Sequence, residues 1–360
     1  MVVVGAGAMG SATAWWLARR GRSVALLEQF EAGHRKGSSH GGTRIFRFAY
    51  DDPLYARLAV DALGSWRELE ADTGSTLLEI TGGVDHGPRV IVDTIAATLK
   101  QIGARHECLG REEAAERFAG MLFDESVVYS PDGGRCYADL TVRTLQERVS
   151  TLGGSVHFNT GRAVVENHGD YVVVSNPAGL SWHAPVAVIT AGAWVEPVLG
   201  GAGAYGIPPM VVSQEQICHF APLDANREWP SFIHHGVAGL DSAVYGLRTP
   251  GEGVKVGGHH EGPAVSGDDR DFVLDPRRID QAVAYVERWF PGLDTTPIHG
   301  ATCLYTTAPT KDFVLDRVGP LVIGSPCSGH GFKFTPEIGR ILADIAQGGA
   351  PPGGRFSLAR

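Results

Sequence analysis

Three glycines near the N-terminus, Gly5, Gly7 and Gly10, have the spacing of a turn that binds the pyrophosphate of a dinucleotide. The first permits a tight turn after a strand, the second lets the backbone approach the phosphates, and the third lets the next helix pack close to the strand. The N-terminus of that helix offers free N–H groups and the positive end of a dipole. Glu28 follows about twenty residues on, where an acid binds the ribose hydroxyls of adenosine. The turn predicts an adenine dinucleotide without distinguishing FAD from NAD.

The elements around this turn must hold it at the end of a strand. A buried strand over 2–4, a helix over about 9–20 and a second strand over 23–27 meet that need. Another helix is predicted to begin at Asp52, as its N-cap, and Pro53. The buried stripe of this helix is expected to contain Leu54, Leu58, Ala62, Trp66 and Leu69.

Later segments indicate both kinds of element. Strands are predicted over 186–190 and 321–323, and alternating stretches within 206–300 indicate an antiparallel sheet. The last helix is predicted to have Thr335 as its N-cap and Pro336 at its first position. The Gly- and Pro-rich segment from 348 is predicted to leave the core.

The bulk composition narrows the class of protein. A chain of 360 residues suits about two domains, and its net charge of −9 argues against nucleic acid or an anionic membrane as a partner. The five cysteines are odd in number and show no Cys-x-x-Cys pair, so neither a disulfide framework nor a zinc site is predicted. No leader peptide and no apolar run of about 20 residues is seen, which favours a cytoplasmic protein. We predict no metal site.

Four stretches together resemble the family of monomeric sarcosine oxidase and N-methyl-L-tryptophan oxidase, flavin amine oxidases of the D-amino-acid oxidase-like superfamily. They are GSSHGGTRIFR at 37–47, GVKVG at 253–257, CLYT at 303–306 and SGHGFKF at 328–334. The resemblance implies a mixed α/β fold in which a Rossmann-like FAD domain is joined to a substrate domain with a mixed, largely antiparallel sheet. The FAD domain is expected over 1–81, 139–205 and 300–347, the substrate domain over 82–138 and 206–299, and a tail over 348–360.

The resemblance also assigns roles to individual side chains. Cys303 matches the cysteine that carries FAD through a thioether, although a lone cysteine is more often a small buried thiol. Lys255 matches the lysine that activates oxygen, where a fixed cation stabilises the charge of reduced oxygen. Arg47 and Lys333 match the pair that holds the substrate carboxylate.

Further positions follow from the same match. His259, His330 and Tyr245 are assigned to polarity and positioning in the active site, with proton roles left open, and Arg44 to positive charge beside the flavin. The cofactor-binding set is predicted as Gly5, Gly7, Ala8, Met9, Gly10, Glu28, His40, Thr43, Arg44, Val164, Ala191, Gly192, Trp194, Cys303, Gly329, Gly331, Phe332 and Lys333. Ser39 and Gly42 depart from the family pattern, where a histidine and an aspartate are frequent, and this puts sarcosine itself in doubt.

The implied function is FAD-dependent oxidation of an N-methyl or other secondary-amine amino acid by oxygen. The products would be an imine, which hydrolyses to amine and aldehyde, and hydrogen peroxide. A cyclic imino acid of the pipecolate or proline type, or a specialised amine metabolite, is the alternative substrate. An NAD-linked opine-type dehydrogenase is the distant alternative, and it would not need Cys303 or Lys255. The family implies a monomer whose partners are a small amine carboxylate and oxygen.

Overall fold

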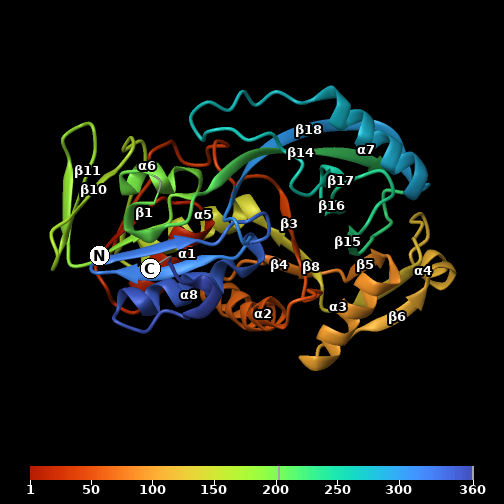
Figure 1. The fold of residues 1–360 in the computed structure, drawn as a ribbon, viewed down its shortest axis with the longest axis horizontal. Coiled ribbons are helices and arrows are strands. Elements are labelled where there is room, and N and C mark those ends of the chain that lie inside the picture. Colours follow the sequence, from red (N-terminus) through yellow and green to blue (C-terminus); the bar gives the residue numbers. More distant parts are fainter. Residues whose placement is uncertain (202, 359–360) are drawn as a thin grey trace.

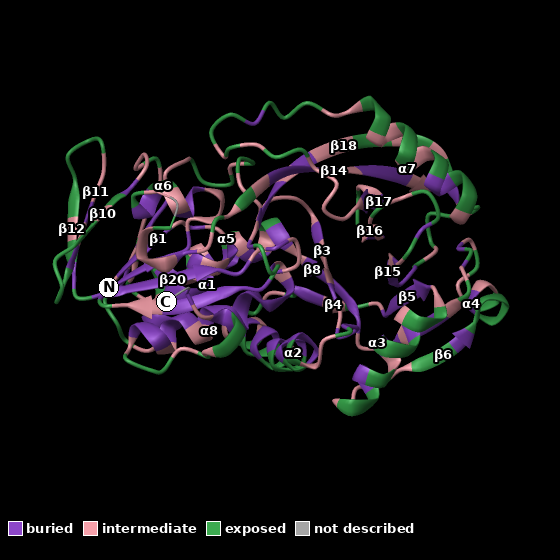
Figure 2. Cartoon of the chain, viewed as in Figure 1, coloured by how far each residue is buried: buried purple, intermediate pink, exposed green. Residues whose placement is uncertain are grey.

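The computed structural model describes residues 1–201 and 203–358. Its N-terminal strand β1 (Val2–Val4) lies inside a six-stranded sheet, between β13 (Ala187–Ile189) and β2 (Ala25–Leu27) (Figure 1). The outer strands are β9 (Ser155–His157) on one side and β20 (Leu321–Ser325) and β19 (Val314–Val318) on the other. All pairs are parallel except that of β19 with β20. The short runs of Val, Ile and Leu are buried, as parallel sheets require (Figure 2).

Helices cover one face of this sheet. Helix α1 (Ala8–Arg19) packs against α8 (Thr335–Ala346) and α5 (Ala138–Thr151), and α2 (Pro53–Thr73) packs against α8. The approach of α8 to α1 is close, since a Cβ on Gly339 would lie 2.6 Å from the Cβ of Ala12. The opposite face is covered by α6 (Val195–Leu199) and a three-stranded sheet of β10 (Val164–Asn167), β11 (Val172–Ser175) and β12 (Ser181–Ala184).

A second large sheet has eight strands in the order β18-β14-β17-β16-β15-β5-β7-β6. Their bounds are β18 (Leu293–Thr307), β14 (Val211–Pro222), β17 (Gly253–Gly258), β16 (Val244–Thr249), β15 (Ser231–His234), β5 (Gly83–Gly87), β7 (Ser126–Ser130) and β6 (Glu107–Gly110). Only β5 and β15 pair in parallel, so the predicted mixed, largely antiparallel sheet is confirmed. The long strands β14 and β18 run side by side toward α7 (Pro276–Trp289), which packs on this sheet (Figure 1).

Smaller elements join the two sheets. Strands β3 (Thr43–Phe46), β8 (Gly134–Tyr137) and β4 (Leu78–Ile80) form a three-stranded sheet, and β3 contacts β16. Helix α3 (Arg89–Gln101) packs on β5 and β7, and α4 (Arg111–Arg117) packs on β6. In the described ranges, no helix combines the length and the apolar character needed to cross a bilayer.

The predicted helix starts have different outcomes. Asp52 caps α2 as expected, because its Oδ1 accepts a hydrogen bond from the backbone N–H of Leu54. The exposed side chain of Leu54 does not belong to the buried stripe, whose other four members are buried. Thr335 is not an N-cap. It has helical backbone angles and follows a 3-10 turn over 332–334, and its hydroxyl donates to the carbonyl of Phe332.

The C-terminal segment stays with the core, so its predicted departure is wrong. Phe356 and Leu358 are buried, and the Arg355 guanidinium lies 2.6 Å from the carboxylate of Asp312. The expected domain boundary at residue 300 falls within β18, which is continuous.

Candidate active site

One cavity of about 1220 Å³ extends from the glycine turn to the eight-stranded sheet. Its wall contains residues from both terminal regions of the chain, including Gly5 and Lys333. The predicted site residues that line it are Gly5, Gly7, Ala8, Met9, Glu28, His40, Arg44, Arg47, Ala191, Gly192, Trp194, Tyr245, Lys255, His259, Cys303, Gly329, His330, Gly331, Phe332 and Lys333. The fold therefore gathers most of the predicted set around one space.

Three predicted cofactor-binding residues lie outside this wall. Val164 is on an exposed face of β10, and Ala163 lines the cavity in its place. Thr43 is buried beside the site, with its hydroxyl 2.6 Å from that of Thr249. Gly10 lies behind the turn, where a Cβ would be 1.9 Å from the carbonyl oxygen of Gly5.

The glycine turn has the geometry that a pyrophosphate needs. Gly5 has a left-handed φ of 97°, and a Cβ there would lie 2.6 Å from the carbonyl oxygen of Thr190. The carboxylate of Glu28 accepts a hydrogen bond of 3.0 Å from the backbone N–H of Ala6. The Ser39 hydroxyl accepts one of 3.0 Å from the N–H of Ala8. Glu28 and the first turn of α1 are thus brought together as the spacing predicts.

The chain fits FAD along this cavity. The buried Nε2 atom of His40 has no hydrogen-bond partner in the described structure, although it lies in a cavity wall. Burial, and the charge of Arg44, lower the pKa of His40 to about 3, so the ring is neutral. An orphaned polar atom beside a glycine cradle is what a polar cofactor would satisfy. The turn, Glu28 and His40 would hold the group.

Lys255 lies on β17 and is buried. Its Nζ atom donates a hydrogen bond of 2.5 Å to the carbonyl oxygen of Thr43. Burial, followed by the charge of Arg44, lowers the pKa of Lys255 to about 7. The guanidinium of Arg44 is itself held by the carbonyls of Thr43, Ser38 and His40. The part of the site beside Thr43 therefore contains a fixed cation, Arg44, and a second cation, Lys255, whose charge changes near neutral pH.

Arg47 is held from the side of the eight-stranded sheet. Its Nη1 atom donates a hydrogen bond of 3.1 Å to Oδ1 of Asp85, and that oxygen lies 2.9 Å from Nε2 of His235. Burial acts to raise the pKa of Asp85, but Arg47 and His235 hold it below its ordinary value. The Arg47 guanidinium also lies over the ring of Tyr50, 4.5 Å from its centre. These contacts fix the orientation of Arg47 in the cavity.

Lys333 is the second basic side chain at this end of the cavity, and burial, followed by the charge of Arg47, lowers its pKa well below the ordinary value. Its Nζ atom donates hydrogen bonds to Oη of Tyr50 (2.9 Å) and to the carbonyl of His330 (2.8 Å). Because that Tyr50 oxygen accepts from Lys333, its proton is free to point at Nδ1 of His330, 3.1 Å away. Burial, followed by Lys333, lowers the pKa of His330 well below its ordinary value. Tyr50 therefore joins Arg47, Lys333 and a neutral His330.

His259 and Cys303 lie at the junction of the two sheets. His259 Nδ1 is 3.5 Å from Oη of Tyr305, and burial, followed by His260, lowers its pKa well below the ordinary value. Cys303 lies on β18 opposite Glu215. Burial raises the pKa of its thiol, while Arg44 acts in the opposite direction.

Three residues of the site were missed from the sequence. They are Asp85, His235 and Tyr50, and none of them lies in a recognisable motif. The roles of Asp85 and His235 depend on the pairing of β5 with β15, which aligns residues about 150 apart, and Tyr50 reaches Lys333 from the segment after β3. The one signal in the sequence was an acid, Asp85, within a short strand, but the sequence did not show that Arg47 and His235 would be its partners. The neighbouring His234 faces away, with Nδ1 3.1 Å from Oη of Tyr285 beneath α7.

Comparisons with known proteins agree with this architecture. A family described as FAD dependent oxidoreductase matches residues 1–345. The chain is 32% identical to peroxisomal sarcosine oxidase of Homo sapiens, over 96% of this chain and 91% of that one. It is 31% identical to monomeric sarcosine oxidase of Streptomyces avermitilis, over 100% and 97% of the two chains. The open form of NikD, an unusual amino acid oxidase essential for nikkomycin biosynthesis, superposes with a TM-score of 0.88 at 25% identity, covering 99% and 96%.

Proposed function

Because the chain belongs to the family of FAD-dependent oxidoreductases, we propose that it oxidises an N-methyl or other secondary-amine amino acid at the C–N bond. The observation that carries this proposal is the pair of basic side chains, Arg47 and Lys333, that face one cavity and share Tyr50. A bound carboxylate would favour the charged form of Lys333, whose pKa burial lowers. A carboxylate is the small anion that a fixed guanidinium and an ammonium group bind together.

When bound, FAD supplies the acceptor for the two electrons that leave the C–N bond. The chain's own residues bind the carboxylate and orient the carbon. The positive charge of Arg47 also disfavours protonation of the nearby amine, which must be neutral to release electrons. The neutral rings of His259 and His330 add polarity without a further charge.

The reaction balances with oxygen as the second substrate. The amine loses two electrons and two protons to become an imine, and oxygen gains them to become hydrogen peroxide. Hydrolysis of the imine gives amine and aldehyde. Lys255, on the side of β17, supplies the positive charge that stabilises reduced oxygen. We also infer that the enzyme acts as a monomer, as the name of the Streptomyces relative suggests.

A substrate panel tests the proposed activity. Purified holoenzyme is mixed anaerobically with sarcosine, N-methyltryptophan, pipecolate, proline and glycine, and the visible flavin absorbance is followed. We expect bleaching by at least one secondary-amine amino acid and, in air, one hydrogen peroxide for each oxygen consumed. Pipecolate or proline as the best substrate would select the cyclic class. No bleaching by any member, or bleaching only by NADH, would contradict the proposal.

We further propose that FAD is tethered through Cys303, and Cys303→Ala is expected to abolish the tether. Wild-type protein precipitated with acid should give a yellow pellet, whereas the variant should give a colourless pellet and a yellow supernatant. Cys327 provides a matched control, because it lines the same cavity and its Sγ accepts a bond of 3.4 Å from the N–H of Thr306. A yellow pellet from Cys303→Ala, or a colourless one from Cys327→Ala alone, would refute the assignment.

A further inference from the structure

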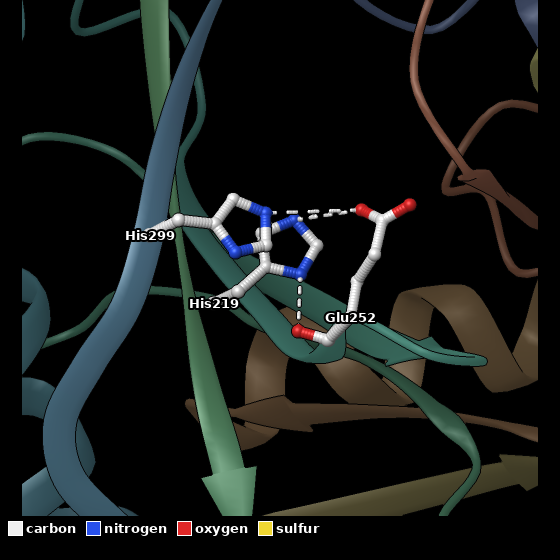
Figure 3. A group of neighbouring side chains, drawn as sticks. All are labelled: His219, Glu252 and His299. Atoms are coloured by element: carbon white, nitrogen blue, oxygen red, sulfur yellow. Dashed lines mark hydrogen bonds and ion pairs between the residues drawn. The ribbon is translucent and has the colours of Figure 1, made fainter.

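Three side chains that the proposed chemistry does not use meet on the eight-stranded sheet (Figure 3). His219 on β14 and His299 on β18 are directly opposite in register, and their rings stack at 4.3 Å and 15°. Glu252 reaches them from the turn before β17. Its Oε2 atom lies 3.6 Å from Nε2 of His219 and 3.9 Å from Nε2 of His299. One donor atom from each residue lies within 4.8 Å of the other two.

The hydrogen bonding of His219 decides its tautomer. Its Nδ1 atom is 3.1 Å from the carbonyl oxygen of Glu252, which can only accept, so Nδ1 carries the hydrogen. In a neutral ring the lone pair is then on Nε2, and it faces the Oε2 atom of a carboxylate, which also accepts. Two facing acceptors are satisfied by a species that binds both lone pairs, and a cation or a bridging water meets that need.

The register of the sheet places His219 in the wall of the large cavity. Lys255 is directly opposite His219 in the pairing of β14 with β17. A neutral imidazole whose other nitrogen donates to a carbonyl is the arrangement found behind metal-ligating histidines.

We propose that His219, Glu252 and His299 form a site for a transition-metal dication of the Zn²⁺ type. Two imidazole nitrogens and one carboxylate oxygen are the donor set of open zinc sites, in which water completes a tetrahedron. Donor atoms around such an ion are roughly 3.4 Å apart, whereas Oε2 of Glu252 lies 3.6 and 3.9 Å from the two ring nitrogens and all three donor atoms lie within 4.8 Å of one another. Binding would therefore draw the three side chains together and turn the two stacked rings toward a common ion. The side chains of His299 and Glu252 are 42% and 39% exposed, which gives the ion a route from solvent.

The position of Glu252 depends on a glycine in the neighbouring loop. A Cβ on Gly42 would lie 2.5 Å from Oε1 of Glu252 and 2.6 Å from Cγ2 of Thr249. Only glycine leaves the carboxylate its present place beside the two rings. The proposed site thus depends on the absence of a side chain at Gly42 as well as on three ligands, and these ligands line the same cavity as the proposed active site.

The test is metal binding by the full-length holoenzyme, freed of metal with a chelator. Calorimetric titration with ZnCl₂ should show one site, and CoCl₂ should give the visible bands of tetrahedral Co²⁺ at wavelengths beyond the flavin absorbance. His219→Gln, His299→Gln and Glu252→Gln should each weaken Zn²⁺ binding at least about tenfold, whereas the exposed His183→Gln should not. Zn²⁺ should also raise the Tm of the wild type but not that of Glu252→Gln. The Tm of each variant without metal shows whether that variant is folded.

Two results would overturn the proposal. One is Zn²⁺ affinity that is unchanged in all three ligand variants, which would place the ion elsewhere on the surface. The other is stronger binding of Mg²⁺ or Ca²⁺ than of Zn²⁺, which would contradict a site built from two imidazoles. Neither readout depends on amine oxidation, so failure of the proposed function would leave this test intact.

Discussion

Lys255→Met should slow the reaction of the reduced enzyme with oxygen by about 10²- to 10³-fold, the loss that follows removal of one preorganised charged or polar group from a transition state. Reduction by the amine should change little, because the ammonium lies by Thr43 and away from the Arg47–Lys333 pair. Stopped-flow measurement of the two half-reactions separates these effects. The exposed Lys100→Met is the control.

The same residue predicts a pH dependence. Burial lowers the pKa of Lys255 to about 7, and only the protonated form carries the charge that stabilises reduced oxygen. Reoxidation of the wild type should therefore decline as pH rises above 7, and negative charge on a nearby reduced cofactor would move the decline upward. In Lys255→Met this dependence should be lost. Equal slowing of both half-reactions, or an unchanged pH profile in the variant, would argue against the role.

Arg47→Gln should lower kcat/KM for a carboxylated amine by roughly 30- to 1000-fold, equivalent to about 2–4 kcal/mol for loss of one partner from a charged pair. The effect should appear mainly in KM, since the guanidinium grips a group that does not react. For the corresponding amine without a carboxylate, the same substitution should have little effect. The ratio of the two kcat/KM values is the quantity to measure.

Two controls separate loss of carboxylate binding from loss of structure. Removing Arg47 leaves the buried Asp85 with His235 as its remaining charged partner, so the Tm and the flavin content of Arg47→Gln are measured to check folding. Lys333→Met removes the other cation without disturbing Asp85, and it should also lower kcat/KM selectively for the carboxylated substrate. An equal loss of kcat/KM for both amines would mean that Arg47 and Lys333 support the structure of the site and do not bind the carboxylate.

Local patterns in the sequence predicted the parts of the fold that depend on neighbours in the chain. In the turn from Gly5 to Gly10, Gly5 needs a positive φ, and both glycines lie where a Cβ atom would clash with the backbone. The spacing of the glycines in the sequence indicates both requirements. Asp52 followed by Pro53 marks a helix start for equally local reasons. The mixed second sheet came from the family resemblance, and its strands were only partly readable from alternation.

Other features depend on contacts that local patterns do not encode. Thr335 is a residue type that often caps helices, but a 3-10 turn before it continues directly into α8, so Thr335 is already inside the helix. The composition of the Gly- and Pro-rich tail predicted a segment outside the core, but Phe356 packs within the hydrophobic core. The support of Arg47 by Asp85 and the meeting of His219 with His299 depend on strand order and register, which are set by the whole sheet.

The interior position of β1 has a consequence for how this protein is made. Val4 leaves the ribosome before its partner Ile189, which follows only after about 10–40 s of synthesis at ordinary rates. Helix α8, which packs on α1, emerges later still. During that interval the strand and the glycine turn lack the elements that cover them in the fold, so the nascent chain depends on protection from aggregation until α8 has been made.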